Sequence, residues 1–204
     1  GATAFQLKYS CFQANNGPIK YCECKSDCPT SPPLSSGSRT LLTDDNIKSA
    51  INVCMYSDGG SHISDGLCSS TEYGAMPDWD VSKVTNMTFI FEGVRSLISS
   101  QFNADLSRWN VSAVKEMRGL FYSLSSFNAS ISSWDVSSVR DMSNMFESAN
   151  AFTQDLSDWD TSSLTRLDRI FYNSNANPKV ADWDVSRVTN MASVFSHAYS
   201  FNQD

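Results

Sequence analysis

The chain has 204 residues, of which 41% are hydrophobic and 18% are charged, and its formal net charge is −7 at pH 7. The apolar content excludes a wholly disordered chain, and the acidic balance argues against nonspecific binding to nucleic acid or to an anionic membrane. We therefore expect no nucleic-acid partner. No apolar run approaches the roughly 20 residues that cross a bilayer, so we also expect no membrane span.

Residues 1–40 are expected to form a cysteine-rich segment that ends in a linker. Its first part alternates apolar and polar residues in the manner of a β-strand, with the apolar positions at Phe5, Leu7 and Tyr9. Residues 29–38 are rich in Pro and Ser, which is typical of an extended linker. The chain begins at Gly1 without a signal segment, as we expect of a processed mature protein, and a trimmed chain would begin in the same way.

The cysteines are confined to the first third of the chain. They are Cys11, Cys22, Cys24, Cys28, Cys54 and Cys68. An even number in a short region predicts three disulfides and an oxidising compartment. Cys54 and Cys68 flank a loop rich in Gly, Ser and Asp, so we favour a bond between them and leave the pairing of the other four open. Zinc is the alternative for the close cluster, but Cys22-Glu23-Cys24 is shorter than the usual C-x2–4-C knuckle, and we expect no metal.

Residues 41–75 are predicted to be a helical N-terminal cap. Either Thr43 or Asp44 can serve as the N-cap of a helix. The apolar positions of that helix have the spacing of one face, and they are Ile47, Ala50, Ile51 and Cys54. This face suits packing on the open end of a repeat array.

Residues 76–204 contain a repeat marked by tryptophan. Tryptophan recurs with gaps of 30, 25, 25 and 24 residues, at Trp79, Trp109, Trp134, Trp159 and Trp183. A unit of this length cannot bury its own apolar face and has to stack on a neighbour. The longer first gap contains about five extra residues within 92–101, which we expect to form a loop on one face. The pattern predicts five stacked coils, the last of them incomplete, with the tryptophans inside.

Two periods coexist within each unit. In the third unit Trp134 and Val136 alternate like a short strand. The following apolar residues have helical spacing, at Met142, Met145, Phe146 and Ala149. The fold class expected from the sequence is therefore an α/β-type repeat solenoid, similar to a leucine-rich repeat, with a disulfide-rich N-terminal cap.

The repeat resembles a known family. The stretches 134–139, 142–146 and 151–157 read WDVSSV, MSNMF and AFTQDLS, and the entry segment 73–79 reads YGAMPDW. These strings are similar to the BspA-like leucine-rich repeat family in its W-D-V-S-x-V-x-x-M-x-x-M-F variant, over about residues 41–204. The resemblance implies a secreted or surface-attached protein that acts in adhesion or cell-envelope structure and has no catalytic motif.

Three sequons support a secretory route. They are Asn86-Met87-Thr88, Asn110-Val111-Ser112 and Asn128-Ala129-Ser130, and we expect N-glycans at Asn86, Asn110 and Asn128. Asn110 occupies the position after tryptophan that is otherwise held by aspartate, at Asp80, Asp135, Asp160 and Asp184. A glycan at Asn110 requires this row to face solvent.

Other repeated side chains are better explained by structure than by ligand binding. The aspartate row could hold calcium, but the Ser and Thr residues beyond it favour local Asx turns. The tryptophans could stack on sugars, yet equivalent positions of a stacked repeat usually form its core. The methionines have core-filling positions, at Met87, Met117, Met142, Met145 and Met191. A threonine column of the kind that binds ice is interrupted at Lys115 and Arg140.

The sequence favours a non-enzymatic function. His62 and His197 are the only histidines, and neither lies in a nucleophile or metal motif, so we expect no catalytic residue and no cofactor. Residues 195–204 repeat the spacing of 146–155 without a capping segment, which predicts an open last coil that is covered either by further chain or by another molecule. We expect an extracellular structural glycoprotein that self-assembles head to tail into a surface fibril, with Phe5, Leu7 and Tyr9 of one copy meeting Phe195 and Phe201 of another. The alternative is a cell-surface adhesion module that binds a glycan or protein along its side.

Overall fold

The computed structural model describes residues 41–56, 65–68, 71 and 73–203, together with 10–11 and 22–23. The chain separates into two compact units, Gly1–Ser38 and Arg39–Asp204. In the first unit, strands β1 (Ser10–Cys11) and β2 (Cys22–Glu23) pair antiparallel, with Cys11 opposite Cys22. The predicted strand at 5–11 is therefore described only at its last two residues.

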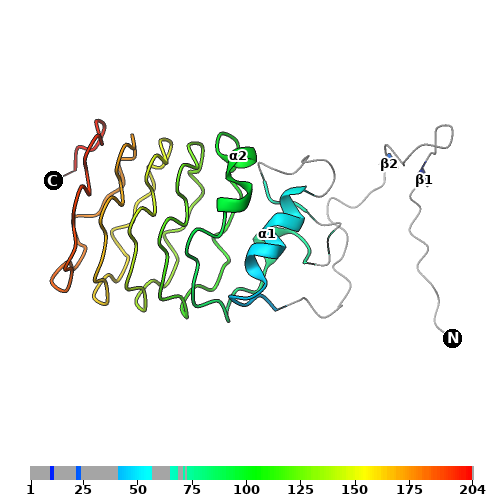
Figure 1. Cartoon of the computed structure of the whole chain (residues 1–204), viewed down its shortest axis with the longest axis horizontal. Helices are drawn as coiled ribbons and strands as arrows, with labels where there is room; N and C mark the ends of the chain where they lie inside the picture. The colour runs from blue at the N-terminus through cyan, green and yellow to red at the C-terminus, as the bar shows by residue number, and fades with distance from the viewer. Residues whose placement is uncertain are drawn as a thin grey trace. The chain divides into compact units, whose positions relative to one another are not determined.

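The second unit begins with helix α1 (Ile47–Tyr56), which packs beside the first coil (Figure 1). The helix buries one face, formed by Ile47, Ala50, Ile51, Cys54 and Met55. These include the four positions that the apolar spacing predicts. The chain entering the helix is tied to the first coil by the main-chain hydrogen bond from Leu42 N to Asp80 O at 3.1 Å.

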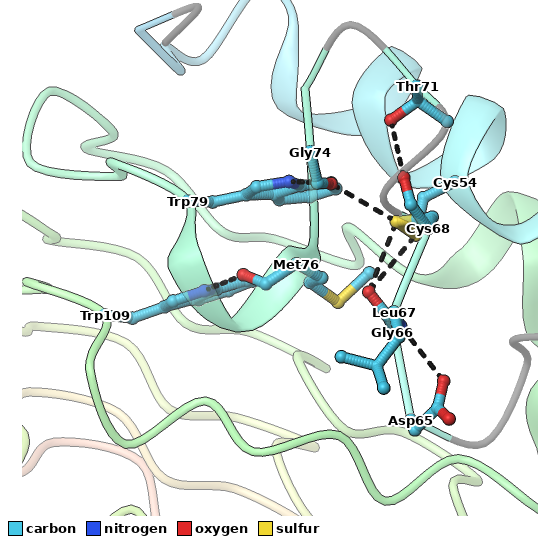
Figure 2. Close-up of a disulfide and its surroundings, with 10 residues drawn as sticks. All are labelled: Cys54, Asp65, Gly66, Leu67, Cys68, Thr71, Gly74, Met76, Trp79 and Trp109. Carbon is cyan, nitrogen blue, oxygen red and sulfur yellow. Dashed lines mark hydrogen bonds between the residues drawn. A yellow bond between two sulfur atoms is a disulfide. The ribbon is translucent and has the colours of Figure 1, made fainter. Parts of the chain in front are cut away.

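A disulfide fastens α1 to the segment that leads into the coils (Figure 2). It joins Cys54, within the helix, to Cys68, and this is the pair that the loop composition favours. Close by, the indole of Trp79 donates to the carbonyl oxygen of Gly74 at 3.0 Å, and that of Trp109 donates to Met76 O at 2.9 Å. The disulfide thus lies where the helical end of the unit meets the first two tryptophans.

The rest of the unit is a stack of coils, each beginning at a tryptophan. We call them the first (79–108), second (109–133), third (134–158), fourth (159–182) and last (183–203) coil. Figure 1 shows them side by side in chain order. Neighbouring coils are joined by main-chain hydrogen bonds between equivalent residues, such as Phe121 N to Met145 O and Phe146 N to Ile170 O, both at 2.9 Å.

The core consists of aromatic columns that run through the stack. Trp79, Trp109, Trp134 and Trp159 are buried as predicted, and Trp183 is half-buried. Each indole N–H from the second coil onward donates to the carbonyl oxygen three residues before the preceding tryptophan, as Trp134 does to Leu106 O at 3.0 Å. A second column stacks phenylalanines with ring centroids 5.6–5.8 Å apart, at Phe121, Phe146, Phe171 and Phe195.

The prediction of an α/β-type repeat solenoid is wrong. The four coils from the second to the last contain no helix and no named strand. They are built from turns, and they meet at isolated parallel bridges such as Glu116 with Asp141. Among the described residues, helices occur only as α1, η2 (Met76–Asp78), and η3 (Glu92–Val94) with α2 (Arg95–Ile98) in the long first coil. The expected loop at 92–101 is thus largely helical. The disulfide-rich cap is also not found, since the part of the chain described here holds a single disulfide.

Left-handed residues explain why the helical spacing does not give a helix. Met145 N bonds to Met142 O, and Ala149 N bonds to Phe146 O, so the i, i+3 spacing reflects consecutive β-turns. Asn144 and Ser148 each have φ of +59°, which neither a helix nor a strand accommodates. Two residues with positive φ recur in this segment of each coil after the first. No helix among the described residues is long and apolar enough to cross a membrane.

Candidate functional site

The face of the last coil that points away from the stack carries unpaired main-chain donors. In the third coil, four alternate N–H groups donate to carbonyl oxygens of the fourth coil at 2.9–3.0 Å, at Met142, Asn144, Phe146 and Ser148. The fourth coil repeats this row toward the last coil. In the last coil the equivalent donors have no hydrogen-bond partner among the described residues, and they are Met191, Ser193, Phe195 and His197. Unpaired strand-like donors in a row are a template for another chain.

Apolar side chains accompany this row of donors. Met142 and Phe146 are fully buried in the third coil, whereas their equivalents Met191 and Phe195 are 48% and 43% exposed. Within the described ranges, the exposed large hydrophobic residues all lie near the two ends of the unit. They are Leu41, Val53, Tyr56 and Leu67 before the coils, and Val185, Met191, Phe195 and Tyr199 in the last coil. The coils between them expose no large apolar side chain. We call the surface formed by Val185, Met191, Phe195 and the four free N–H groups the end face.

The opposite end of the stack is closed by a side chain. The carboxylate of Asp44 accepts hydrogen bonds from Thr85 N at 2.7 Å, Asn86 N at 2.9 Å and Thr85 Oγ1 at 2.6 Å. In the next coils the carbonyl oxygen of the preceding coil fills this place, as Thr85 O does for Lys115 N at 2.8 Å. Partial desolvation raises the pKa of Asp44, but the hydrogen bonds from Thr85 and Asn86 outweigh it and leave the pKa below its ordinary value.

Thr43 and Asp44 were predicted as alternative N-caps of α1, and the carboxylate of Asp44 does not cap the helix. Thr43 O accepts a hydrogen bond from Ile47 N at 3.1 Å, and Thr43 N donates to the side-chain oxygen of Asn46 at 2.8 Å, as in a capping box. The carboxylate of Asp44 is committed to the first coil instead. A main-chain carbonyl and an aspartate carboxylate are both acceptors, so one aspartate can end the ladder on this side.

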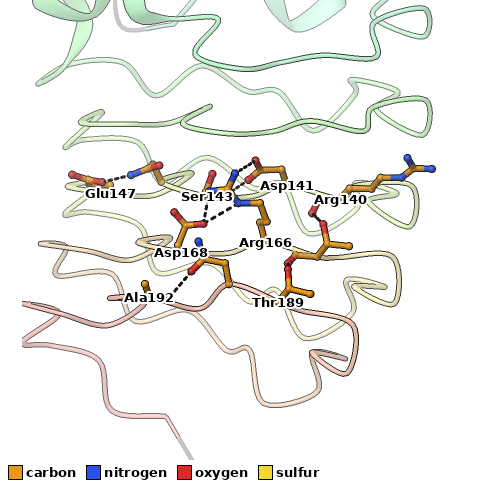
Figure 3. A network of polar contacts seen from close by, with 11 residues as sticks. Arg140, Asp141, Ser143, Glu147, Arg166, Asp168, Thr189 and Ala192 are labelled. Carbon is orange, nitrogen blue, oxygen red and sulfur yellow. Dashed lines mark hydrogen bonds and ion pairs between the residues drawn. The ribbon is translucent and has the colours of Figure 1, made fainter.

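One side of the stack carries a charged column (Figure 3). Arg166 lies 3.0 Å from a carboxylate oxygen of Asp168 and 3.8 Å from one of Asp141. The hydrogen bond to Asp168 and the charge of Asp141 raise the pKa of Arg166. Two coils before Arg166, desolvation and the nearby charge of Asp141 raise the pKa of Glu116. Arg166 thus lies near the carboxylates of both Asp141 and Asp168 and offsets their negative charges. This is a structural role.

The aspartate row makes Asx turns, as the sequence predicts. Each side-chain oxygen accepts the N–H two residues ahead at 2.9–3.1 Å, in Asp80, Asp135, Asp160 and Asp184. The hydroxyl of Thr165, in the threonine column, donates to Arg140 O at 2.9 Å, so this threonine is bonded to the main chain. Among the residues that the structure describes, no group of three His, Cys, Asp or Glu could hold a metal ion.

The three sequon asparagines differ in their surroundings. Asn86 and Asn110 are exposed, and their side-chain oxygens accept N–H groups of the third sequon residue, from Thr88 at 2.8 Å and Ser112 at 3.2 Å. Asn128 is half-buried, and its oxygen accepts bonds from Thr153 N and Gln154 Nε2, both at 3.0 Å. Asn86 and Asn110 therefore present the more accessible amides.

Several predicted residues lie outside the described part of the chain. These are Phe5, Leu7, Tyr9, Cys24 and Cys28, while Cys11 and Cys22 are described only as members of β1 and β2. Phe195 and Phe201 pack on each other, with ring centroids 4.1 Å apart. The free N–H row could have been found by aligning the coils, since its members occupy equivalent positions. Nothing in the sequence marked Asp44 as an acceptor for the first coil.

Comparison with known proteins identifies a family. Residues 66–176 and 98–204 both match the family described as "Mycoplasma protein of unknown function, DUF285", so that the matches together span 66–204. No curated protein and no solved structure gives a significant match.

Proposed function

The chain belongs to the DUF285 family, and we propose that it is an extracellular structural glycoprotein that assembles head to tail through the end face. The observation that carries the proposal is the end face itself, where four main-chain donors and exposed apolar side chains occur together. Main-chain pairing supplies affinity in strand addition, and apolar side chains supply register. A second copy is the proposed occupant.

The opposite end of the same unit offers a surface of matching character. Leu41, Val53, Tyr56 and Leu67 are exposed there, between 41% and 59% of their surface. A contact between two different ends is heterologous, and repetition of it extends a filament unless the rotation closes a ring. The polar sides of the coils, with their Asx turns, remain on the outside of such a filament.

The extracellular part of the proposal rests on covalent chemistry and on resemblance. The disulfide between Cys54 and Cys68 favours an oxidising compartment. Asn86 and Asn110 carry exposed amides within sequons, away from the end face. The likeness of the repeat to BspA-like surface proteins supports a place at the cell surface. We propose no catalytic activity, since the polar side chains described above form Asx turns within a coil or hydrogen bonds and ion pairs between coils.

Sedimentation velocity across a concentration series tests assembly. The 204-residue chain should show a mass that rises with concentration, whereas Phe195→Asp should stay monomeric because it places a charge in the apolar contact. Ser132→Asp adds the same charge on an exposed side of the second coil and should assemble like the parent chain. A parent chain that remains monomeric at every concentration contradicts the proposal.

The intact mass before and after glycosidase treatment tests whether the protein is glycosylated. For native material we expect glycans at Asn86 and Asn110 and a lower occupancy at Asn128, where the side chain is half-buried and its oxygen is engaged. An unmodified mass, together with free thiols under denaturation, would remove the extracellular part of the proposal.

A further inference from the structure

A hollow of about 380 Å³ lies on one side of the stack, away from the end face. It is lined by residues of the first four coils. Three of these are arginines, in a chain whose net charge is −7. They are Arg95, Arg118 and Arg169. A concentration of cations on an acidic protein needs a local explanation.

Two of the arginines are held in place by aromatic rings and have no acidic partner. The guanidinium of Arg95 lies 4.9 Å from the ring centre of Tyr122, and that of Arg118 lies 5.7 Å from the ring centre of Phe89. The two rings meet edge to face, with centroids 5.8 Å apart. Neither arginine forms an ion pair with another described residue. Stacking orients a guanidinium while leaving its N–H groups free to bind a planar anion.

The third arginine is already neutralised. Arg169 donates two hydrogen bonds to the carboxylate of Glu147, at 2.9 and 3.1 Å, and lies 4.0 Å from the ring centre of Tyr172. Asn144 also donates to Glu147, at 2.6 Å. This side of the hollow therefore presents a fixed carboxylate, and Glu92 adds a second one.

The hollow uses residues that the local backbone does not favour. One position in each coil has φ between +47° and +60°, and it is occupied by Phe89, Gly119, Asn144, Arg169 and Ser193. Glycine and asparagine suit this conformation, whereas phenylalanine and arginine do not. Phe89 and Arg169 both line the hollow. Strained positions that persist in a fold point to a function.

Two departures from the repeat build the site. The extra segment of the first coil supplies Arg95 at the start of α2, anchored by the buried side chains of Val94 and Ile98. Gly119 supplies the space for the ring of Phe89, because a β-carbon at residue 119 would collide with that ring. Neither feature is needed to continue the stack, since the later coils lack both.

We infer that this hollow binds an acidic sugar chain, with the carboxylates of uronic acid residues on Arg95 and Arg118. The aromatic rings of Phe89 and Tyr122 are half-exposed and offer apolar faces to the sugar. The carboxylates of Glu147 and Glu92 accept hydrogen bonds from sugar hydroxyls. An acidic peptide such as tetraglutamate has no sugar hydroxyls to donate to these carboxylates, so it fits less well.

Titration calorimetry with tetragalacturonate tests the inference, with cellotetraose and tetraglutamate as the neutral sugar and the acidic peptide. Tetragalacturonate should bind at least tenfold more tightly than either comparison ligand. Arg95→Gln and Arg118→Gln should each weaken its binding at least tenfold. Arg140→Gln, which removes an exposed arginine outside the hollow, should change binding less than twofold. Equal binding of all three ligands, or no effect of the two hollow variants, overturns the inference.

A second variant separates binding from folding. Phe89→Asn places a residue that tolerates positive φ at the strained position, so the thermal midpoint should stay unchanged or rise while tetragalacturonate binding falls at least tenfold. A lowered midpoint with unchanged binding would make Phe89 a packing residue and contradict its role in the site.

Discussion

The two ends of the coil stack differ in how their main-chain N–H groups and apolar core are covered. At the first coil, the carboxylate of Asp44 accepts the main-chain N–H groups of Thr85 and Asn86, and α1 covers the apolar core. At the last coil, the N–H groups of residues 191, 193, 195 and 197 are unpaired and Phe195 is 43% exposed. Within residues 41–203 the stack therefore has one closed end and one end with unpaired donors.

The largest expected contrast lies between an inner phenylalanine and its equivalent on the end face. Phe146→Ala should lower the free energy of unfolding by about 3–5 kcal/mol, because the ring is fully buried between Phe121 and Phe171 and leaves a cavity. Phe195→Ala should cost only roughly 1 kcal/mol, because its site is open to water. Urea denaturation at low protein concentration measures both, and equal losses would contradict the difference between the coils.

The closed end should depend on its disulfide. Replacing Cys54 and Cys68 together by Ala should cost about 2–4 kcal/mol, because the bond closes a loop of sequence separation 14 in the unfolded chain. Hydrogen exchange should speed up in α1 and remain unchanged in the third and fourth coils. Faster exchange throughout the stack would show that the coils depend on the helical end.

Replacing Asp44 should cause a smaller loss of stability, and that loss should depend on pH. Asp44→Asn should cost about 1 kcal/mol at pH 7, because the amide keeps one acceptor oxygen but loses the charge and the second acceptor that strengthen the bonds to Thr85 and Asn86. The pKa of Asp44 is lowered in the folded state, so its contribution is complete above the unfolded value near 3.8 and is lost as the pH falls through the folded pKa. Thermal melts of the two proteins should therefore converge once the pH falls below the folded pKa of Asp44. A difference that persists at low pH would mean that the carboxylate charge is not what closes this end.

The smallest effect is expected inside the stack. The hydroxyl of Ser143 is buried and has no hydrogen-bond partner among the described residues. Ser143→Ala removes this unpaired group at almost constant volume, so the thermal midpoint should stay unchanged or rise. A clear loss of stability would reveal a partner for this hydroxyl and weaken the view that inner coils are held by main-chain bonds and packing.

The sequence predicted the stacking of the coils better than their local structure. The tryptophan period could be interpreted because large apolar residues in phase must face one core, and Trp109, Trp134 and Trp159 are indeed buried. The helical spacing at Met142 and Met145 misled because β-turns share its i, i+3 contacts.

Left-handed conformations and long-range acceptors were the features that could not be predicted. Asn144 is a residue type that often adopts positive φ, but Ser148 is not, and both do so here. Asp44 meets Thr85 across 41 residues, and a single aspartate carries no mark of a partner so distant. The arginine hollow was missed for the same reason, since Arg95 and Tyr122 meet only through the fold.

Amide hydrogen exchange on the 204-residue chain across a concentration series tests the central claim most directly. The amides of Met191, Ser193, Phe195 and His197 should exchange rapidly at low concentration, in contrast to those of Met142, Asn144, Phe146 and Ser148. As concentration rises, the four end-face amides should become protected together, because a second copy then accepts their hydrogen bonds. If they stay unprotected at every concentration, the end face is not an assembly surface and the account is contradicted.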